Sequence, residues 1–225
     1  RTLSILRNTS ITGNIIPSSF AAKVDLITGS NPYSIATGDL DRDGKPDIVV
    51  ANANDKTISV LRNTSTSGSI TTAAKIDFAT GSFPTSVAIG DVDGDGKPDL
   101  VVANGGSSTV SVFRNTSTSG SIDASSFAAK VDFTLATTPY FVAVGDVDGD
   151  GKPDLVTANQ NGNNISVLRN ISISGIISFA TKVDFPTGDV PRSVAIGDID
   201  GDGKPDLVVA NTNSNSVSVL RNTST

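Results

Sequence analysis

Four short acidic segments carry the side chains of this sequence that are best suited to chemistry. In residues 91–99, Asp occupies positions 1, 3, 5 and 9, Gly96 occupies position 6 and Lys97 occupies position 7. A hard cation such as Ca²⁺ takes about six to eight oxygen ligands, which alternate aspartates of a tight loop and one backbone carbonyl can supply. Glycine at position 6 permits the sharp turn. The spacing therefore predicts a calcium site.

The same pattern occurs in four places, so we expect about four Ca²⁺ ions, one per copy. The predicted ligands, with the lysines acting through their backbone carbonyls, are Asp39, Asp41, Asp43, Lys45, Asp47, Asp91, Asp93, Asp95, Lys97, Asp99, Asp146, Asp148, Asp150, Lys152, Asp154, Asp198, Asp200, Asp202, Lys204 and Asp206. Position 12 is Val or Thr rather than the Glu of an EF-hand, and Mg²⁺ fits less well because it retains waters in near-octahedral sites. Asp-Gly segments also form ordinary turns, but a turn does not need several carboxylates that repel one another without a cation.

The residue types that are missing exclude most enzymatic chemistry. The 225 residues contain no Glu, His, Cys, Met or Trp, so thiol nucleophiles, Ser-His-acid arrangements and imidazole or thiolate metal sites are ruled out. Asp55, Asp123 and Asp189 lie outside every repeated pattern, and nothing pairs them as the two carboxylates of a glycosidase. We therefore expect a protein that is not an enzyme.

Charge and apolar patterning restrict the partners. The formal charge is −6, which argues against nucleic acid as a partner. Adding four ions of charge +2 to −6 gives +2, so bound metal would leave the molecule nearly neutral. Apolar runs such as 48–51 are far shorter than the roughly 18 residues that span a membrane. The absence of Cys excludes disulfides but does not exclude secretion.

Internal repeats organise the whole chain. The acidic segments begin at positions 39, 91, 146 and 198, in steps of 52, 55 and 52 residues, and Arg-Asn pairs keep the same register, so that alternate repeats match at 107 residues. We predict a single region over 1–225, with repeats at about 12–66, 67–118, 119–173 and 174–225, and with residues 1–11 as a strand of a preceding repeat. Because residues 1–11 align with 215–225, we interpret the chain as a slice of a larger propeller or repeat array.

Each repeat contains four strand-like runs, and no helical period competes. The run 100–103 is apolar on both faces, which is typical of a buried strand. Alternation in 130–133, and of Ser111 with its neighbouring valines, predicts strands nearer an exposed edge. Four strands in a repeat of roughly 50 residues are typical of a propeller blade. The predicted fold is therefore an all-β β-propeller built of four-stranded antiparallel blades.

The segment Ser-Val-Ala-Ile-Gly-Asp-Val-Asp-Gly-Asp-Gly-Lys-Pro-Asp-Leu-Val-Val-Ala-Asn, residues 86–104, has three counterparts in the chain. These segments resemble the FG-GAP and VCBS-type repeats, whose blades form the propeller of integrin α-chains and occur in many bacterial surface proteins. The resemblance implies that each acidic loop joins the first two strands of a blade and binds calcium through its aspartates. In place of the Gly-Ala-Pro of the eukaryotic repeat, this chain has Val-Ala-Asn or Thr-Ala-Asn. In this respect it is similar to the bacterial branch of the family. Arg42 replaces the Gly found at position 4 of the other loops.

Ligand-binding positions are expected where the repeats differ from one another. The residue after the repeated Pro is Tyr33, Thr85, Tyr140 or Arg192, and the turns between the second and third strands, 53–56, 105–108, 160–163 and 212–215, also vary. Tyr33 and Tyr140 could stack on a sugar, and packing within the blades is the alternative.

Two further sets of residues recur at fixed positions. Asn-Thr-Ser or Asn-Ile-Ser triplets begin at Asn8, Asn63, Asn115, Asn164, Asn170 and Asn222. They have the form of glycosylation acceptors, although the fixed position of most of them favours a polar turn at a strand end. Asp25, Asp77, Asp132 and Asp184 recur two residues after a Lys, so we expect a structural role beside it.

Together these features predict a non-enzymatic, calcium-binding module of a secreted or cell-surface protein that serves adhesion, ligand binding or extracellular structure. The expected partners are calcium, an extracellular protein or glycan ligand, and further repeats of the same chain or copies of it; neither nucleic acid nor membrane insertion is expected. Two alternatives remain open: a lectin-like, glycan-binding propeller, and a non-catalytic region attached to an extracellular enzyme.

Overall fold

A computed structural model describes residues 1–224, which fold almost entirely into antiparallel β-sheets. Blade 1 holds β3 (Pro32–Gly38), β4 (Asp47–Asn52), β5 (Thr57–Leu61) and β6 (Ile76–Ala79). Blade 2 holds β7 (Pro84–Gly90), β8 (Asp99–Asn104), β9 (Thr109–Phe113) and β10 (Val131–Thr134). Blade 3 holds β11 (Pro139–Gly145), β12 (Asp154–Asn159), β13 (Asn164–Leu168) and β14 (Val183–Pro186). Blade 4 holds β15 (Pro191–Gly197), β16 (Asp206–Asn211) and β17 (Ser216–Leu220).

The N-terminal residues form a separate strand pair. Within the described part of the chain, β1 (Thr2–Ile5) pairs with β2 (Val24–Ile27) alone, and a short 3-10 helix, η1 (Pro17–Ser19), lies in the connection between them. β1 corresponds in sequence to β17, and β2 corresponds to the outer strands of the blades. The outer strand of each blade therefore belongs to the next sequence repeat: the repeat 119–173 supplies β10 to blade 2 and β11 to β13 to blade 3.

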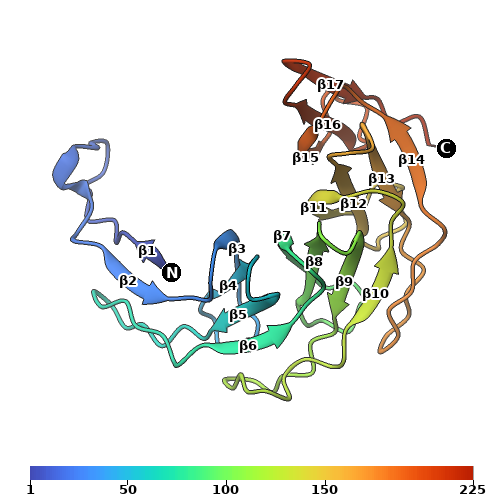
Figure 1. Cartoon of the computed structure of the whole chain (residues 1–225). Helices are drawn as coiled ribbons and strands as arrows, with labels where there is room; N and C mark the ends of the chain where they lie inside the picture. The colour runs from blue at the N-terminus through green and yellow to red at the C-terminus, as the bar shows by residue number, and fades with distance from the viewer. Residues whose placement is uncertain (225) are drawn as a thin grey trace.

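The blades fan out around a common centre, as Figure 1 shows, with β3, β7, β11 and β15 innermost and β6, β10 and β14 at the periphery. Neighbouring inner strands pack side by side, β3 against β7, β7 against β11, and β11 against β15. Together with the N-terminal strand pair, the blades describe an open arc. This arrangement of antiparallel four-stranded sheets confirms the predicted all-β propeller architecture.

A hydrophobic core fills the space between each pair of neighbouring blades. Val49 and Ile58 of blade 1 cluster with Leu100 and Val102 of blade 2, and equivalent clusters join blade 2 to blade 3 and blade 3 to blade 4. Val101 and Val102 are both fully buried, although they face opposite sides of β8. The second strand is thus buried on both faces, as its apolar run predicted, and each blade depends on its neighbours for burial of apolar surface.

Glycine at the end of the inner strands allows neighbouring blades to approach closely. A Cβ added at Gly90 would lie 2.8 Å from Cγ1 of Val144, and one added at Gly145 would lie 3.0 Å from Cδ1 of Ile196. Both distances are shorter than a carbon–carbon contact allows. The glycine before the acidic loop therefore serves packing between blades, a role that the loop motif alone did not indicate.

The outer strands form the exposed edge of the blades, but the prediction for Ser111 was wrong. Asp132 of β10 is exposed, whereas Ser111 of β9 is fully buried. Its hydroxyl accepts a hydrogen bond of 2.8 Å from Nδ2 of Asn104 and donates one of 2.6 Å to Oδ1 of Asp132. A polar residue in the third strand is satisfied by the strands on both sides, so its alternation with valines does not signal contact with water.

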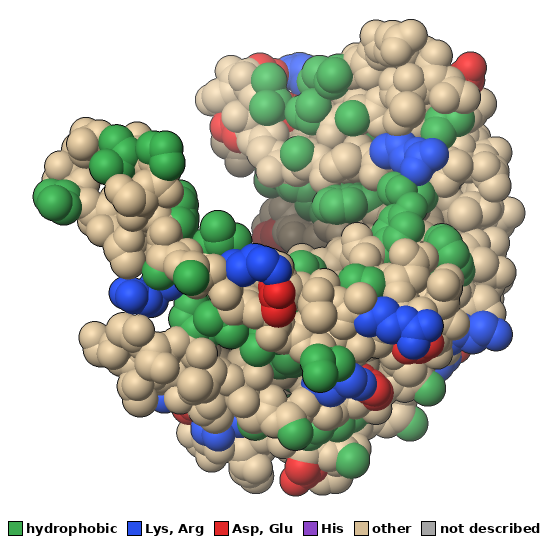
Figure 2. All heavy atoms as spheres, turned by 60° about the vertical axis from the view of Figure 1, so that its left-hand side comes forward, with side chains coloured by type: hydrophobic (Ala, Val, Ile, Leu, Met, Phe, Trp, Pro, Cys, Tyr) green, Lys and Arg blue, Asp and Glu red, His purple; other side chains and the backbone are tan. Residues whose placement is uncertain are grey.

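Figure 2 brings the N-terminal side of the molecule forward and shows the surface hollowed between the N-terminal strands and the C-terminal half. Across residues 1–224, none of the helices has the length and apolar character needed to cross a membrane.

Candidate metal centre

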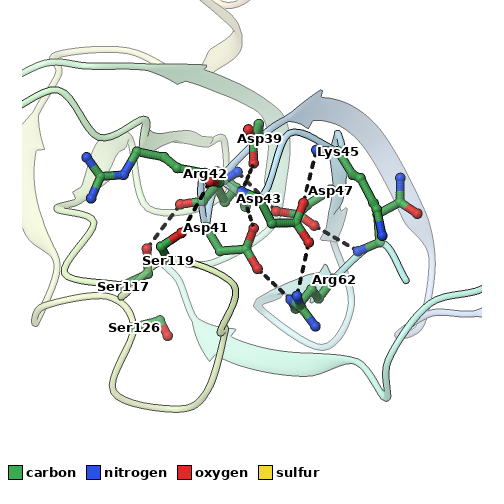
Figure 3. A network of polar contacts seen from close by, with 12 residues as sticks. Asp39, Asp41, Arg42, Asp43, Lys45, Asp47, Arg62, Ser117, Ser119 and Ser126 are labelled. Atoms are coloured by element: carbon green, nitrogen blue, oxygen red, sulfur yellow. Dashed lines mark hydrogen bonds and ion pairs between the residues drawn. The ribbon is translucent and has the colours of Figure 1, made fainter. Parts of the chain in front are cut away.

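Each acidic segment forms the loop between the inner and second strands of one blade. Loop 1 (39–47) lies between β3 and β4, and loops 2 (91–99), 3 (146–154) and 4 (198–206) occupy the same place in blades 2 to 4. In loop 1, the backbone N–H groups of Asp43 and Gly44 donate to the Asp39 carboxylate at 3.0 and 2.9 Å (Figure 3). Gly44 has a φ of 86°, which favours glycine. The loop thus folds around its first carboxylate.

Three carboxylates converge in every loop, with one oxygen of each lying within 4.8 Å of the others. The converging groups are Asp39, Asp41 and Asp43; Asp91, Asp93 and Asp99; Asp146, Asp148 and Asp154; and Asp198, Asp200 and Asp206. Positions 1 and 3 take part in all four loops, joined by position 5 in loop 1 and by position 9 in the others. Asp47, Asp95, Asp150 and Asp202 lie outside these closest groups but within the same loops.

The position-9 carboxylate is held firmly in place by the backbone. In loop 2, Oδ2 of Asp99 accepts from the N–H of Val92 at 2.9 Å, and Oδ1 accepts from the N–H of Asn115 at 2.7 Å. Burial raises the pKa of Asp99 to about 6, although these two N–H donors oppose the shift. Burial also raises the pKa of Asp47 and Asp154, whereas N–H donation by Asn222 lowers the pKa of the corresponding Asp206. A cation would offset the cost of keeping the buried carboxylates charged.

Arg42 adopts the left-handed conformation that its position in the loop requires. Its φ is 55°, close to the 72° of Gly94, which occupies the same position in loop 2. Loop 1 thus keeps the backbone turn despite the substitution, with strain that glycine avoids.

An arginine directly after the third strand faces the acidic loop, a contact that was not predicted from the sequence. Arg62 donates from Nε to Asp41 and from Nη2 to Asp43, the latter at 3.0 Å (Figure 3). Arg221 bonds in the same way to Asp200 and Asp202, while Arg114 lies 4.0 Å from Asp95. The sequence does contain a signal for this cation. The Arg of each repeated Arg-Asn pair follows its acidic loop at a constant separation along the chain.

The position-7 lysines also use their side chains. Nζ of Lys97 donates to the carbonyl of Ser117 at 3.0 Å, and Nζ of Lys152 donates to that of Ser172 at 3.0 Å. These contacts tie the loop to the connection between the third and outer strands of the same blade. The backbone carbonyl of each lysine remains the group predicted to ligate the metal.

Each of the first three loops is clamped by the following blade. Nδ2 of Asn115 in blade 2 donates to the carbonyl of Leu40 in loop 1 at 2.8 Å, and the N–H of Gly120 donates to the carbonyl of Asp41 at 3.0 Å. Asn170 of blade 3 repeats the contact with Val92 of loop 2 at 2.8 Å. Figure 3 shows Ser117 and Ser119 of blade 2 beside loop 1. Loop conformation and docking of the next blade are therefore linked.

The same contacts explain the Asn triplets as polar turns at strand ends. The side chains of Asn115 and Asn170 are fully buried, and their Nδ2 atoms also donate to Pro98 and Pro153 within their own blades. The buried amides are engaged, as the polar-turn interpretation predicted. The Nδ2 of Asn63 donates within its own blade, to Pro46 at 2.8 Å, and among the described residues it donates to no other blade.

The recurring Lys-x-Asp pairs have the expected structural role. Asp77 binds Lys75 and accepts from Ser59, and Asp184 binds Lys182 and accepts from Ser166. These contacts lower the pKa of both aspartates against the opposing effect of burial, which is the largest single influence.

The three isolated aspartates each serve a local contact. Asp55 accepts from the N–H of Ser30 at 2.7 Å, Asp123 accepts from the N–H of Ser125 at 2.7 Å, and Asp189 accepts from Asn163 at 2.9 Å.

Comparison with known proteins identifies the family. The model of the FG-GAP-like repeat matches residues 39–102, 91–157 and 146–209, so the chain belongs to the FG-GAP-like repeat family. No curated protein matches the sequence.

Solved structures support the propeller fold. BBS1N, crystallised in complex with ARL6DN, has a TM-score of 0.55 at 16% identity, with 87% of this chain and 56% of that chain covered. The biofilm matrix protein Bap1 of V. cholerae has a TM-score of 0.52 at 20% identity, with 86% and 27% covered. Virginiamycin B lyase from Staphylococcus aureus has a TM-score of 0.51 at 12% identity, with 97% and 59% covered. The chain thus spans between 27% and 59% of the length of these proteins. The similarity shows the fold alone.

Proposed function

We propose that this chain is a non-enzymatic, calcium-binding propeller module of a secreted or cell-surface protein that serves adhesion, ligand binding or extracellular structure. The observation that carries the proposal is the recurrence of three converging carboxylates in all four loops, with oxygens within 4.8 Å of one another. A structural turn would not need this convergence. Arg62 and Arg221 offset part of the charge in loops 1 and 4, but among the described residues no lysine or arginine forms an ion pair with the three converging carboxylates of loop 2 or loop 3. Like charges at such distances repel without a cation.

The donor set fits calcium. Every loop offers only oxygen donors: the aspartates at positions 1, 3, 5 and 9 and the backbone carbonyl at position 7. Ca²⁺ accepts such a set in flexible geometry, whereas Mg²⁺ demands a near-octahedral site and retains its waters. The bound ion would supply positive charge that holds the carboxylates together.

Calcium in this position would stabilise the array of blades. The carbonyl groups of Leu40 and Val92, each at position 2 of its loop, accept hydrogen bonds from the following blade. A cation that orders the loop would therefore also order the surface on which the next blade docks. Modules of this kind fit an extracellular setting, where calcium is abundant and sites with Kd values of about 10⁻⁴ to 10⁻³ M are filled.

Thermal unfolding with and without calcium tests the assignment. At about 1 mM Ca²⁺, a site with a Kd of about 10⁻⁴ M contributes about 1.4 kcal/mol, so four filled sites should raise Tm by on the order of 10 °C relative to chelator. Magnesium at the same concentration should give a smaller shift. An unchanged Tm, or an equal response to both ions, would contradict the calcium assignment.

A loop variant locates the ions. Asp93→Asn should lower the number of calcium ions bound, measured by equilibrium dialysis, from about four to about three. Asp123→Asn removes the same charge from an exposed turn outside the loops and should leave the number unchanged. Equal binding by both variants would refute the placement of the ion in loop 2.

A further inference from the structure

The inner strand of every blade begins with a β-bulge at the residue of that strand that varies most between repeats. The register with the second strand shifts between Pro32 and Ser34, and at the same place in the other three blades. The bulged residues are Tyr33, Thr85, Tyr140 and Arg192, whereas the preceding Pro is constant. Bulges of this kind redirect a side chain and are frequent beside functional sites.

Three of these bulged residues meet at one place, although they come from blades 1, 3 and 4. The hydroxyls of Tyr33 and Tyr140 lie 2.6 Å apart, and their rings are in edge contact with centroids 5.9 Å apart. Cζ of Arg192 lies 4.2 Å from the centroid of the Tyr140 ring. Phe83, which precedes the bulge of blade 2, packs its edge against Tyr33 at 5.7 Å. We name these four residues the axial cluster.

Arg192 in the axial cluster lacks an anionic partner. Among residues 1–224, no carboxylate lies within 4 Å of its guanidinium, and its enclosed Nε donates no hydrogen bond. By contrast, Arg62 and Arg221 each bind two aspartates. A guanidinium matches a carboxylate through two parallel hydrogen bonds, and stacking on Tyr140 holds its plane in one orientation.

The aromatic members of the cluster present ring surface to solvent. Tyr33 and Phe83 are each 40% exposed, and the Tyr33–Tyr140 hydroxyl pair adds hydrogen-bonding capacity at their edge. The backbone in front of the bulges is strained, since Phe83 and Val190 have φ values of 53° and 57°. Strain of this kind is concentrated at functional sites in proteins.

We propose that the axial cluster binds a carbohydrate that carries a carboxylate, such as a uronate residue of an acidic glycan. The Arg192 guanidinium would pair with the carboxylate, the rings of Tyr33 and Phe83 would cover the apolar C–H face of the sugar, and the tyrosine hydroxyls would bind its hydroxyl groups. A sugar fits better than an acidic peptide because the cluster offers one cation beside two exposed ring faces. The axial cluster lies at the opposite end of the inner strands from the acidic loops, so its ligand is independent of the metal proposed above.

Tyrosine fluorescence reads this site directly, because the chain contains no Trp and its only two tyrosines are Tyr33 and Tyr140. The folded protein, at fixed calcium, is titrated with trigalacturonate and with the same trisaccharide after methyl esterification. Saturation-transfer NMR of the saccharide provides a second readout. The acid should bind at least about tenfold more tightly than the ester, since the ester loses a charge-assisted hydrogen bond.

Variants then assign the roles. Arg192→Gln should weaken binding of the acid about tenfold, to the level of the ester, and leave the ester unaffected. Arg7→Gln removes the same charge from an exposed position in the connection between β1 and β2 and should bind like the unaltered protein. Melting curves without saccharide establish that the variants are folded. If Arg192→Gln does not fold, Arg192→Lys keeps the charge but not the planar fork, and should weaken binding of the acid several-fold.

Three results would overturn the proposal. One is the absence of any tyrosine or NMR response to either saccharide. Another is the absence of a charge effect, seen either as equal binding of acid and ester or as unchanged binding of the acid by Arg192→Gln. The third is a response to an aspartate-containing peptide but not to the saccharides, which would assign the cluster to a protein ligand instead. If Tm proved to be independent of calcium, the proposed metal sites would be contradicted, but the saccharide-binding measurements would still test the axial cluster.

Discussion

Ser111 on β9 and Asp132 on β10 face each other in the sheet register, and the serine hydroxyl donates a hydrogen bond of 2.6 Å to the aspartate. Because Ser111 also accepts from Asn104, its hydroxyl links three strands of blade 2. Ser111→Ala should lower the free energy of unfolding by about 1–3 kcal/mol, since it leaves buried polar partners unsatisfied. Urea denaturation measures the loss.

Ser218 on β17 is the matched control for this change. It accepts from Asn211 at 2.8 Å, but among the described residues no outer-strand aspartate accepts from its hydroxyl. Ser218→Ala should therefore cost less than Ser111→Ala. Equal losses would show that the bond to Asp132 contributes nothing to stability.

Gly90→Ala should separate blades 2 and 3. The added methyl would lie 2.8 Å from Cγ1 of Val144, so a side chain or the inner strand must move, at a cost of about 1–3 kcal/mol. Gly197→Ala makes the same change at a position where, apart from its two chain neighbours, no atom of residues 1–224 lies within 4 Å. It should be neutral or stabilising by up to about 1 kcal/mol, because alanine lowers the entropy of the unfolded chain. A Tm that falls equally for both variants would refute the packing argument.

Asn170→Ala should weaken the clamp on loop 2. The substitution removes donors to the carbonyl groups of Val92 and Pro153, both at 2.8 Å from Nδ2. We expect a loss of about 2–3 kcal/mol in unfolding free energy, because two buried acceptors lose their partners. Asn63→Ala loses the bond to Pro46 and, like Asn170→Ala, a bond from the serine two residues on, but among the described residues it loses no bond to another blade. It should therefore cost about 1 kcal/mol less than Asn170→Ala.

The same pair of variants tests the link between the clamp and the metal. If the following blade orders loop 2, Asn170→Ala should weaken calcium binding at one site, measured by titration followed by the shift in Tm. Asn63→Ala should leave calcium affinity unchanged. Equal affinities in both variants would mean that the loops bind metal independently of the next blade.

Tyr33 should ionise at higher pH than an ordinary tyrosine. Its hydrogen bond with Tyr140 is the main cause of a raised pKa, and burial acts in the same direction. A raised pKa means that the folded state favours the neutral phenol. The resulting contribution to the free energy of unfolding is fully present below pH about 10, the pKa of tyrosine in the unfolded chain. That contribution is lost as the pH rises through the folded pKa.

Ultraviolet absorbance of the ionised phenol follows this titration, because only two tyrosines are present. Tyr140→Phe removes the hydrogen-bond partner and should bring the pKa of Tyr33 back toward its ordinary value. A titration curve of Tyr33 that is the same in both proteins would contradict the role of the hydroxyl pair.

Much of the fold could be predicted from the sequence because the repeats encode local structure. The alternate aspartates and the glycine at position 6 specify a tight acidic loop wherever they occur. Apolar runs such as 100–103 specify strands that must be buried on both faces. Four copies of each pattern made the blade architecture and the positions of the acidic loops predictable without any tertiary information.

Only the tertiary structure decided what those elements contact in neighbouring blades. The burial of Ser111, the approach of Val144 to Gly90 and the meeting of Tyr33 with Tyr140 all depend on the angle at which the sheets pack. The positions of these residues in the sequence do not specify that packing angle. It is set by the burial of apolar side chains between the blades, an interaction that is non-directional and distributed over many residues.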